Sequence, residues 1–149
     1  MPGVRERLTA VPARRLIAPL ALCLVLAVPA LASAKWIVTP SGNIGCLGDR
    51  TEVRCDVLQT TGKPPTRPKS CHFDWGNAFG LKPTGRGRGL CASDTVVPGP
   101  GQKGVITLAY GSSASFGTAM RCTSRRTGLT CRNDGGHGFT LSRTVIKVF

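Results

Sequence analysis

The sequence predicts a mostly β domain: a small disulfide-stapled antiparallel sandwich or barrel with long loops. Apolar segments are short and rich in β-branched and aromatic residues, and the stretches TTGKPPTRPKS, KPTGRGRG and VVPGPGQKG between them carry prolines and glycines that exclude helix. No part of the chain shows a clean apolar stripe at the helical period of 3.6 residues. We therefore expect extended segments at residues 36–39, 44–47, 53–58, 71–75, 105–110, 119–123, 129–132, 139–141 and 144–149.

The N-terminal 34 residues are typical of a secretory signal peptide and are set apart from the fold. Four arginines precede an apolar run over residues 16–31, which ends in small residues that favour cleavage near Ala34. An uncleaved membrane anchor is the alternative, but the run contains two prolines and is short against the roughly 20 residues of a bilayer span. We expect a signal peptide at 1–34 and a single β domain at 35–149, secreted or associated with the cell envelope.

The charge of the expected domain favours an anionic partner. Removing the signal takes away four of the 20 basic residues and one of the seven acidic ones, which leaves a net charge of +10. These charges are spread along the domain, so they do not form a basic tail. An anionic envelope polymer or an acidic protein would complement such a surface. The interleaved aromatic residues on which nucleic-acid binders stack bases are missing.

Six cysteines remain after the signal, and an even number in an exported chain predicts disulfides, although six cysteines allow 15 connectivities. They are Cys46, Cys55, Cys71, Cys91, Cys122 and Cys131. Eight residues separate the members of the first pair and of the last pair, which predicts the same cross-strand bridge in two hairpins and leaves the middle two cysteines to pair by elimination. Zinc sites use ligand pairs two to four residues apart, so we expect no metal and no cofactor.

The first hairpin can be given a register by counting outward from its bridge. If Cys46 faces Cys55, Ile44 faces Val57 on a side that is entirely apolar, and the polar residues fall on the other side. Residues 49–52 are then a four-residue loop, one of the common hairpin lengths. Opposed Cα atoms lie about 4.5 to 5.5 Å apart, within the reach of a disulfide. The sequence therefore predicts a half-buried hairpin.

The second hairpin repeats the cysteine spacing and the expected cross-strand bridge, but it carries a different charge. The stretch 45–56 carries a net charge of −1, whereas 119–134 carries +3. The register leaves 125–128 as the loop, whose glycine can take a positive φ. It also places Arg121 opposite Arg132, which is unfavourable unless solvent or an anion separates the two charges. Alternatively, both arginines are solvated above an apolar surface.

These charges suggest a set of candidate anion-binding residues: Arg121, Arg125, Arg126, Arg132, His137 and Arg143. His137 lies between glycines that could expose its ring as a base or an anion ligand; alternatively, the glycines serve the backbone and His137 caps a carbonyl. Arg143 could clamp a carboxylate or phosphate, or brace Asp134.

Three functions compete. The first is an exported non-enzymatic binding or structural module of the cell envelope, which engages an anionic polymer or an acidic partner through the arginine-rich hairpin. The second is a secreted protease inhibitor that presents Arg86 and Arg88 on a loop closed by Cys71 and Cys91, although three glycines would make that loop mobile.

The third function is a hydrolase that uses His137. The residue types for it are present at His72, His137, Asp74, Asp94, Asp134, Ser41 and Ser142. No Gly-x-Ser-x-Gly or His-Glu-x-x-His motif arranges them, so no catalytic residue is assigned.

The stretches TPSGNIGC, VRCDV, CASDT, LAYG and GLTCRNDGGHGFTLSR resemble a family of exported actinobacterial proteins known only as a domain of unknown function. The resemblance runs from about Trp36 to Phe149 and is most specific from Gly128 to Arg143. It implies export and a compact cysteine-bearing domain, and it supplies neither catalytic residues nor a ligand.

Overall fold

The computed structural model describes residue 3 and residues 33–149. The expected signal segment lies outside the described residues, apart from residue 3 and its last two positions, so its cleavage stays a prediction. The chain divides into the units Met1–Ala30 and Leu31–Phe149, and the second of these contains the β fold. Within residues 33–149, no helix has the length and apolar character that crossing a membrane requires.

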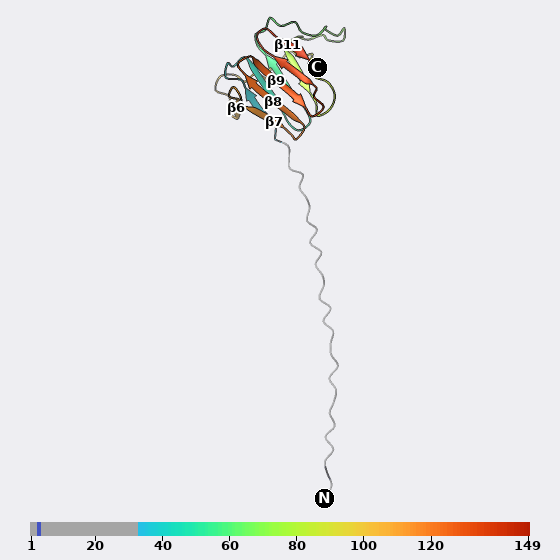
Figure 1. The fold of residues 1–149 in the computed structure, drawn as a ribbon, viewed down its shortest axis with the longest axis vertical. Coiled ribbons are helices and arrows are strands. Elements are labelled where there is room, and N and C mark those ends of the chain that lie inside the picture. Colours follow the sequence, from blue (N-terminus) through green and yellow to red (C-terminus); the bar gives the residue numbers. More distant parts are fainter. Residues whose placement is uncertain (1–2, 4–32) are drawn as a thin grey trace. The chain divides into compact units, whose positions relative to one another are not determined.

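Eleven strands in residues 33–149 form two sheets (Figure 1). The six-stranded sheet has the order β5-β4-β3-β2-β1-β6, with β1 (Lys35–Val38), β2 (Ile44–Gly48), β3 (Val53–Val57), β4 (Ala78–Leu81), β5 (Arg88–Leu90) and β6 (Val105–Thr107). The five-stranded sheet has the order β11-β10-β9-β8-β7, with β7 (Ser113–Phe116), β8 (Met120–Arg125), β9 (Gly128–Asn133), β10 (Gly138–Leu141) and β11 (Ile146–Val148). Neighbouring strands are antiparallel except β1 and β6, which pair in parallel.

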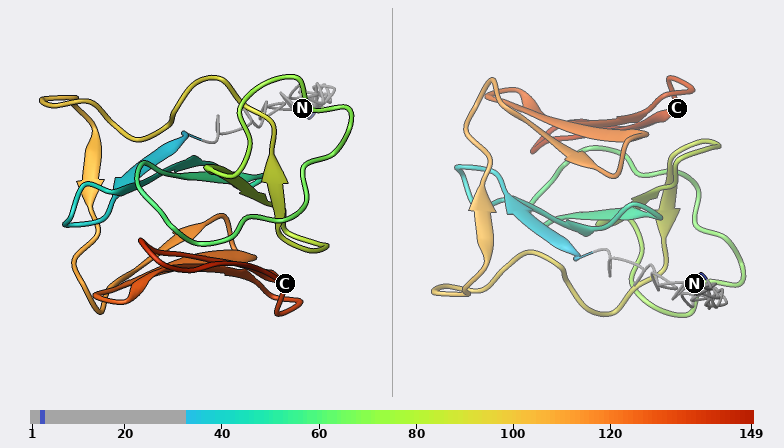
Figure 2. Two further views of the ribbon diagram at one scale, coloured as in Figure 1. Left: turned by 90° about the horizontal axis from the view of Figure 1, so that it is seen from above. Right: turned by 90° about the horizontal axis from the view of Figure 1, so that it is seen from below.

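The two sheets pack face to face as a sandwich, which decides between the two architectures that the sequence allows (Figure 2). The chain passes from one sheet to the other after β6, where the Leu108 N–H donates to Val38 and the Gly111 N–H donates to Ser124. The mostly β fold class is confirmed, and residues 33–149 contain three disulfides.

The core lies between the sheets and contains both cross-strand disulfides. Cys46 is bonded to Cys55 and Cys122 to Cys131, and all four cysteines have no exposed surface. The Cys55 and Cys131 sulfurs are 3.6 Å apart, so the two bridges touch across the sandwich. Apolar side chains surround them, and the rings of Phe79 and Phe139 pack with their centroids 6.0 Å apart. One central cluster therefore joins the two hairpins.

The disulfides join the pairs that the spacing predicts, and the strand registers agree with those obtained by counting outward from each bridge. In the first hairpin Ile44 lies opposite Val57, and in the second Ser124 lies opposite Leu129. The Cα atoms of each cross-strand bridge are 4.0 Å apart, which is closer than the sequence argument assumed. The third disulfide joins Cys71 to Cys91.

The second hairpin has a tighter turn than expected. Arg125 pairs with Gly128, so the loop is only Arg126 and Thr127. Gly128 has φ +134°, and a Cβ atom there would lie 2.3 Å from the Leu141 carbonyl oxygen. Glycine is thus required both by the backbone angle and by the close approach of β10.

The expected strand at 71–75 is wrong, because a side chain holds this segment in a loop. The guanidinium of Arg67 donates to the carbonyl oxygens of Cys71 and Phe73, which a strand would offer to a neighbouring strand. Strands β4, β5 and β7 were not anticipated. They have the sequences AFGL, RGL and SASF, which are short and contain glycine or serine, so that pairing with neighbouring strands defines them rather than local preference.

Candidate functional site

The outer face of the first hairpin is covered, contrary to the expected half-buried arrangement. Arg54 and Asp56 on β3 form a two-point ion pair with both N–O distances 2.9 Å, and Arg54 also reaches Asp94 at 3.1 Å. The second carboxylate oxygen of Asp56 accepts the Val96 N–H at 3.0 Å. The segment around residues 94–98 therefore lies over this face, and a Cβ atom on Gly45 would be only 2.7 Å from Val97.

The charges of this covered face are neutralised locally. The hydrogen bond to Asp56 is the largest cause that raises the pKa of Arg54, and attraction to both carboxylates adds to it, while burial opposes it. Asp56 is only 3% exposed, so its charge is satisfied inside the protein rather than offered to a ligand. This face is structural.

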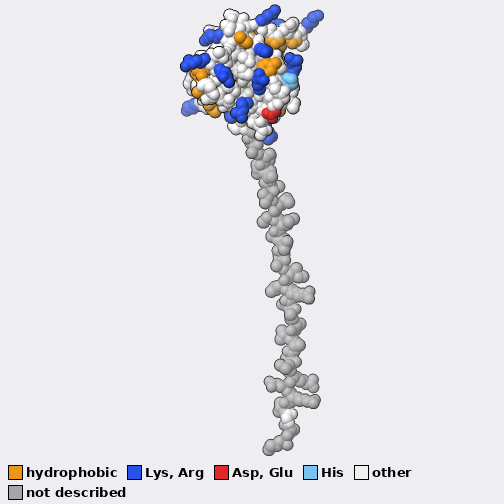
Figure 3. Space-filling model, in the orientation of Figure 1, with side chains coloured by type: hydrophobic (Ala, Val, Ile, Leu, Met, Phe, Trp, Pro, Cys, Tyr) orange, Lys and Arg blue, Asp and Glu red, His pale blue; other side chains and the backbone are white. Residues whose placement is uncertain are grey.

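The outer face of the second hairpin is open and basic. Arg121 lies opposite Arg132, as the register predicts, and both are exposed. A hollow of about 320 Å³ lies over this face, lined by Arg121, Thr123, Arg125, Thr130 and Arg132. Figure 3 shows Lys and Arg side chains distributed over the side of the molecule on which β7 to β11 lie, with acidic side chains only at one small spot.

The cations of this face are not neutralised by carboxylates. Within residues 33–149, ion pairs form only around Arg54 and Arg88. The guanidinium of Arg132 lies 4.7 Å from the centroid of the Phe149 ring, so one member of the opposed pair packs on an aromatic surface. The alternative of arginines lying over apolar surface therefore applies to Arg132, while the charge of the pair stays available to an anion.

Hydroxyl groups accompany the basic residues on the same sheet. Ser113 and Thr123 are hydrogen-bonded at 2.8 Å across β7 and β8, and Thr130 and Thr140 at 3.0 Å across β9 and β10. Side chains alternate between the two faces of a strand, so these hydroxyls share the outer side with the arginines. The face can bind an oxyanion by charge and a polyol by hydrogen bonds.

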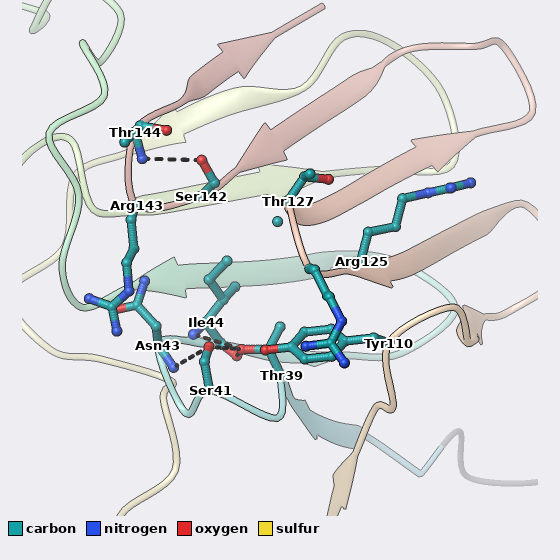
Figure 4. A pocket seen from close by; sticks show the side chains of 12 residues that line it. Thr39, Ser41, Asn43, Ile44, Tyr110, Arg125, Thr127, Ser142, Arg143 and Thr144 are labelled. Atoms are coloured by element: carbon teal, nitrogen blue, oxygen red, sulfur yellow. Dashed lines mark hydrogen bonds between the residues drawn. The ribbon is translucent and has the colours of Figure 1, made fainter.

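A second basic pocket, of about 290 Å³, lies at one end of the sandwich (Figure 4). Its walls come from the turn between β1 and β2, the loop between β8 and β9 and the turn between β10 and β11. It is lined by Thr39, Ser41, Asn43, Ile44, Tyr110, Arg125, Arg126, Thr127, Gly128, Ser142, Arg143 and Thr144. In Figure 4 Arg143 extends toward Asn43, whereas Arg125 points away from the cavity.

The structure divides the predicted anion-binding residues between these two places. Arg121 and Arg132 belong to the open face, Arg126 and Arg143 to the end pocket, and Arg125 lines both. The end pocket as a whole was not predicted, because the turn at 39–43 and Tyr110 carry no sequence signal for it.

His137 lies apart from both places. It is exposed in the turn between β9 and β10, where its main-chain N–H donates to Asn133 and its carbonyl accepts from the same residue. Within the described residues its ring caps no carbonyl, in contrast to the alternative considered for it. Arg143 does not brace Asp134: its guanidinium donates to the Gln59 side chain at 2.7 Å.

The residue types that a hydrolase needs are not assembled around His137. His137 precedes β10 and Ser142 follows it, so the two lie at opposite ends of that strand. Ser41 lines the end pocket with Ser142, whereas Asp94 contacts Arg54 on the other sheet. Among residues 33–149, neither serine is hydrogen-bonded to His137, so no nucleophile–base pair is formed there.

The loop proposed to inhibit proteases is partly fixed in the fold. Arg88 belongs to β5 and forms an ion pair with Glu52, and the buried Gly87 donates its N–H to Phe149. Arg86 is exposed beside it. The segment is therefore more ordered than its glycines suggest, but one of its two arginines is already engaged.

Fold and surfaces together define a disulfide-bonded β-sandwich with one covered face and one open basic face. The chain belongs to a family of unknown function, DUF6636, whose model matches residues 20–149. No curated protein and no solved structure showed significant similarity to the chain. The three disulfides fit an extracellular protein.

Proposed function

We propose that this protein is an exported, non-enzymatic binding module of the cell envelope that engages an anionic polymer through the outer face of β7 to β11. The observation that carries the proposal is the exposed, directly opposed pair Arg121 and Arg132, which forms no ion pair within residues 33–149. Like charges so placed repel each other, and a bound anion would relieve that repulsion.

Neighbouring side chains extend the same surface. Arg125 on β8 and Lys147 on β11 are also exposed, so further cations share the outer face with the opposed pair. The hydroxyl pairs between them suit the polar backbone of a phosphodiester or sugar-acid polymer. A polymer with regularly spaced negative charges would contact several of these cations at once.

A polymer is favoured over an acidic protein because the face lacks an apolar centre. Protein interfaces usually surround a buried aromatic or aliphatic core with polar residues. Here the hollow is lined only by arginines and threonines, and the aromatic ring of Phe149 is already in contact with Arg132.

Retention on two immobilised polymers, poly(glycerol phosphate) and polygalacturonate, tests the proposal. We expect wild-type protein to bind at least one of them at low salt and to elute as salt rises, because exposed charges are screened. The double variant Arg121→Gln/Arg132→Gln should elute at markedly lower salt. Lys69→Gln/Lys103→Gln, which removes the same charge from exposed loops, should elute close to wild type.

If both double variants lost retention equally, the effect would depend only on net charge, and the proposal of a specific binding face would be contradicted. Salt-independent retention, or binding to neither polymer, would also overturn the proposal. If an acidic polypeptide such as polyglutamate were bound while neither of the two polymers was, the assignment to an envelope polymer would be wrong.

A further inference from the structure

We infer that the end pocket is a separate binding site that takes one oxyanion group, a phosphomonoester or a carboxylate, carried by a single sugar-sized hydroxylated unit. It differs from the open face in its walls, because three loops and Tyr110 line it, whereas the open face is lined by residues of the paired strands β8 and β9. The inference does not require the polymer proposal to be correct, and the two can be tested apart.

Charge is the first reason. Arg126 and Arg143 approach the pocket from different elements, the loop between β8 and β9 and the turn between β10 and β11. No aspartate or glutamate is among the residues that line the pocket, and neither arginine forms an ion pair within residues 33–149. Two cations without a counter-charge favour an anion between them.

The two arginines are held in place before any ligand binds. The guanidinium of Arg126 lies 5.3 Å from the centroid of the Tyr110 ring. The guanidinium of Arg143 donates to Gln59, and its main-chain carbonyl accepts from the N–H of Thr61 at 2.7 Å. Arginine has five N–H donors, so one bond to Gln59 leaves a fork for an oxyanion. Such anchoring lowers the ordering cost of binding.

Hydroxyl groups in the wall supply the second kind of contact. The oxygen of Ser142 accepts the N–H groups of Thr144 and Val145 at 3.2 and 2.9 Å, which leaves its own hydrogen to donate (Figure 4). On the opposite wall, the exposed hydroxyl of Ser41 lies 3.2 Å from that of Thr39, which is buried and already bonded to the main chain of Ile44, so Ser41 is the group that a ligand can reach. These groups can bond to ligand hydroxyls that flank the charged group.

The size of the cavity limits the ligand. Pockets for drug-sized molecules are about 300 to 1,000 Å³, and this one, at about 290 Å³, lies at the lower end. It is therefore large enough for one monosaccharide-sized unit. The end of an anionic polymer or a free sugar acid or sugar phosphate would present such a unit.

Calorimetric or NMR titration with glucose 6-phosphate, glucuronate and glucose tests the site in the intact protein. We expect saturable binding of at least one of the two anions and much weaker binding of neutral glucose. Arg143→Gln and Arg126→Gln should each weaken anion binding about tenfold or more, because each removes a charge-assisted hydrogen bond. Arg143→Lys, which keeps the charge but loses the planar fork, should restore only part of the affinity.

The control is Arg121→Gln on the open face, which should leave small-anion binding within about twofold of wild type while weakening polymer retention. Arg143→Gln should fold, because Thr61 contacts only the main chain of Arg143, and an unchanged melting temperature checks this. Preference for glucose 6-phosphate would identify a phosphomonoester site, and preference for glucuronate a carboxylate site. No saturable binding of either anion, equal binding of glucose, or full affinity in both arginine variants would overturn the inference.

Discussion

The hairpins β2–β3 and β8–β9 each contain a cross-strand disulfide, but they differ in what lies on their outer faces. Each has a fully buried bridge between cysteines nine positions apart in sequence, and each directs the bridge into the same core. Position by position, the outward pair Gly45 and Asp56 of the first corresponds to Arg121 and Arg132 of the second. The first pair is covered by the segment around Val96, whereas the second pair is exposed.

The comparison separates stability from function. Inward residues must fit the core, so both hairpins are mostly apolar on that side, with Ser124 as an exception, and their bridges touch at 3.6 Å. Outward residues are free to differ. In the first hairpin Asp56 neutralises Arg54 and accepts a hydrogen bond from the loop at Val96. In the second, no carboxylate forms an ion pair with Arg121 or Arg132 within residues 33–149. The uncovered hairpin is therefore where binding is expected.

Removing either cross-strand bridge should have the largest effect on stability. Cys46→Ala/Cys55→Ala and Cys122→Ala/Cys131→Ala should each lower the free energy of unfolding by about 2–4 kcal/mol, because each bridge closes a loop of the same length in the unfolded chain. Chemical denaturation measures both. A difference well above 1 kcal/mol between the two variants would mean that the bridges are not equivalent devices.

The outer faces should differ in their contribution to stability. Asp56→Ala should cost about 2–3 kcal/mol, because it leaves Arg54 and the Val96 N–H without their buried charged partner. At the corresponding position, Arg132→Ala should cost at most about 0.5–1 kcal/mol, because relief of the repulsion from Arg121 offsets part of the lost contact with Phe149. Equal losses in urea unfolding would contradict the division into a structural face and a binding face.

Reversing one charge of the opposed arginines should raise stability while lowering binding. Arg121→Glu replaces a repulsive cross-strand pair with an attractive one to Arg132, which should add about 0.2–1 kcal/mol. The neutral variant Arg121→Gln should gain less. Thermal unfolding and retention on the polymers would be measured together. Loss of stability in Arg121→Glu would show that the pair does not repel in the folded protein.

A smaller effect is expected at the inward position that differs between the hairpins. The hydroxyl of Ser124 is the only buried side-chain polar group without a hydrogen-bond partner in the described part of the chain, and the first hairpin has Gly48 there. Ser124→Ala should leave stability unchanged or raise it by up to about 1 kcal/mol, because it removes a desolvated hydroxyl. Ser113→Ala, which breaks a hydrogen bond to Thr123, is the control and should not stabilise.

The turns of the two hairpins should differ in their response to pH. The side-chain hydrogen bond from Thr51 is the largest cause that holds the pKa of Asp49 below its ordinary value of 3.8, with backbone N–H groups adding to it. A lowered folded-state pKa gives stability that is present above the unfolded value and is lost as pH falls through the folded value.

Substituting Asp49 tests this small effect. The melting temperature of Asp49→Asn should be slightly below wild type near pH 6, and the gap should shrink toward pH 2. Thr127→Ala in the second turn, which has no carboxylate, should show a gap that does not change with pH. A gap for Asp49→Asn that is constant with pH would contradict the role of its charge.

The sequence by itself determined the local and repeating features of this protein. Cysteine spacing and the two-residue period fixed both bridges and both registers, because a slip of one residue would move every apolar side chain of a hairpin out of the core. It also located the excess of arginine in the second hairpin. Prediction from the sequence failed where strand pairing depends on distant partners. Strands β4, β5 and β7 are too short to show a pattern, and Arg67 holds residues 71–75 in a loop.

Only the tertiary structure decided which basic residues form a site. In the folded protein the segment around Val96, 40 residues away from Asp56 in sequence, packs on the outer face of the first hairpin, whereas the outer face of the second is exposed. The tertiary structure also brought Arg126 beside Tyr110 and Arg143 beside Gln59, contacts between segments far apart in the chain or on different loops. Such contacts depend on how two sheets pack, which periodicity within one strand does not encode.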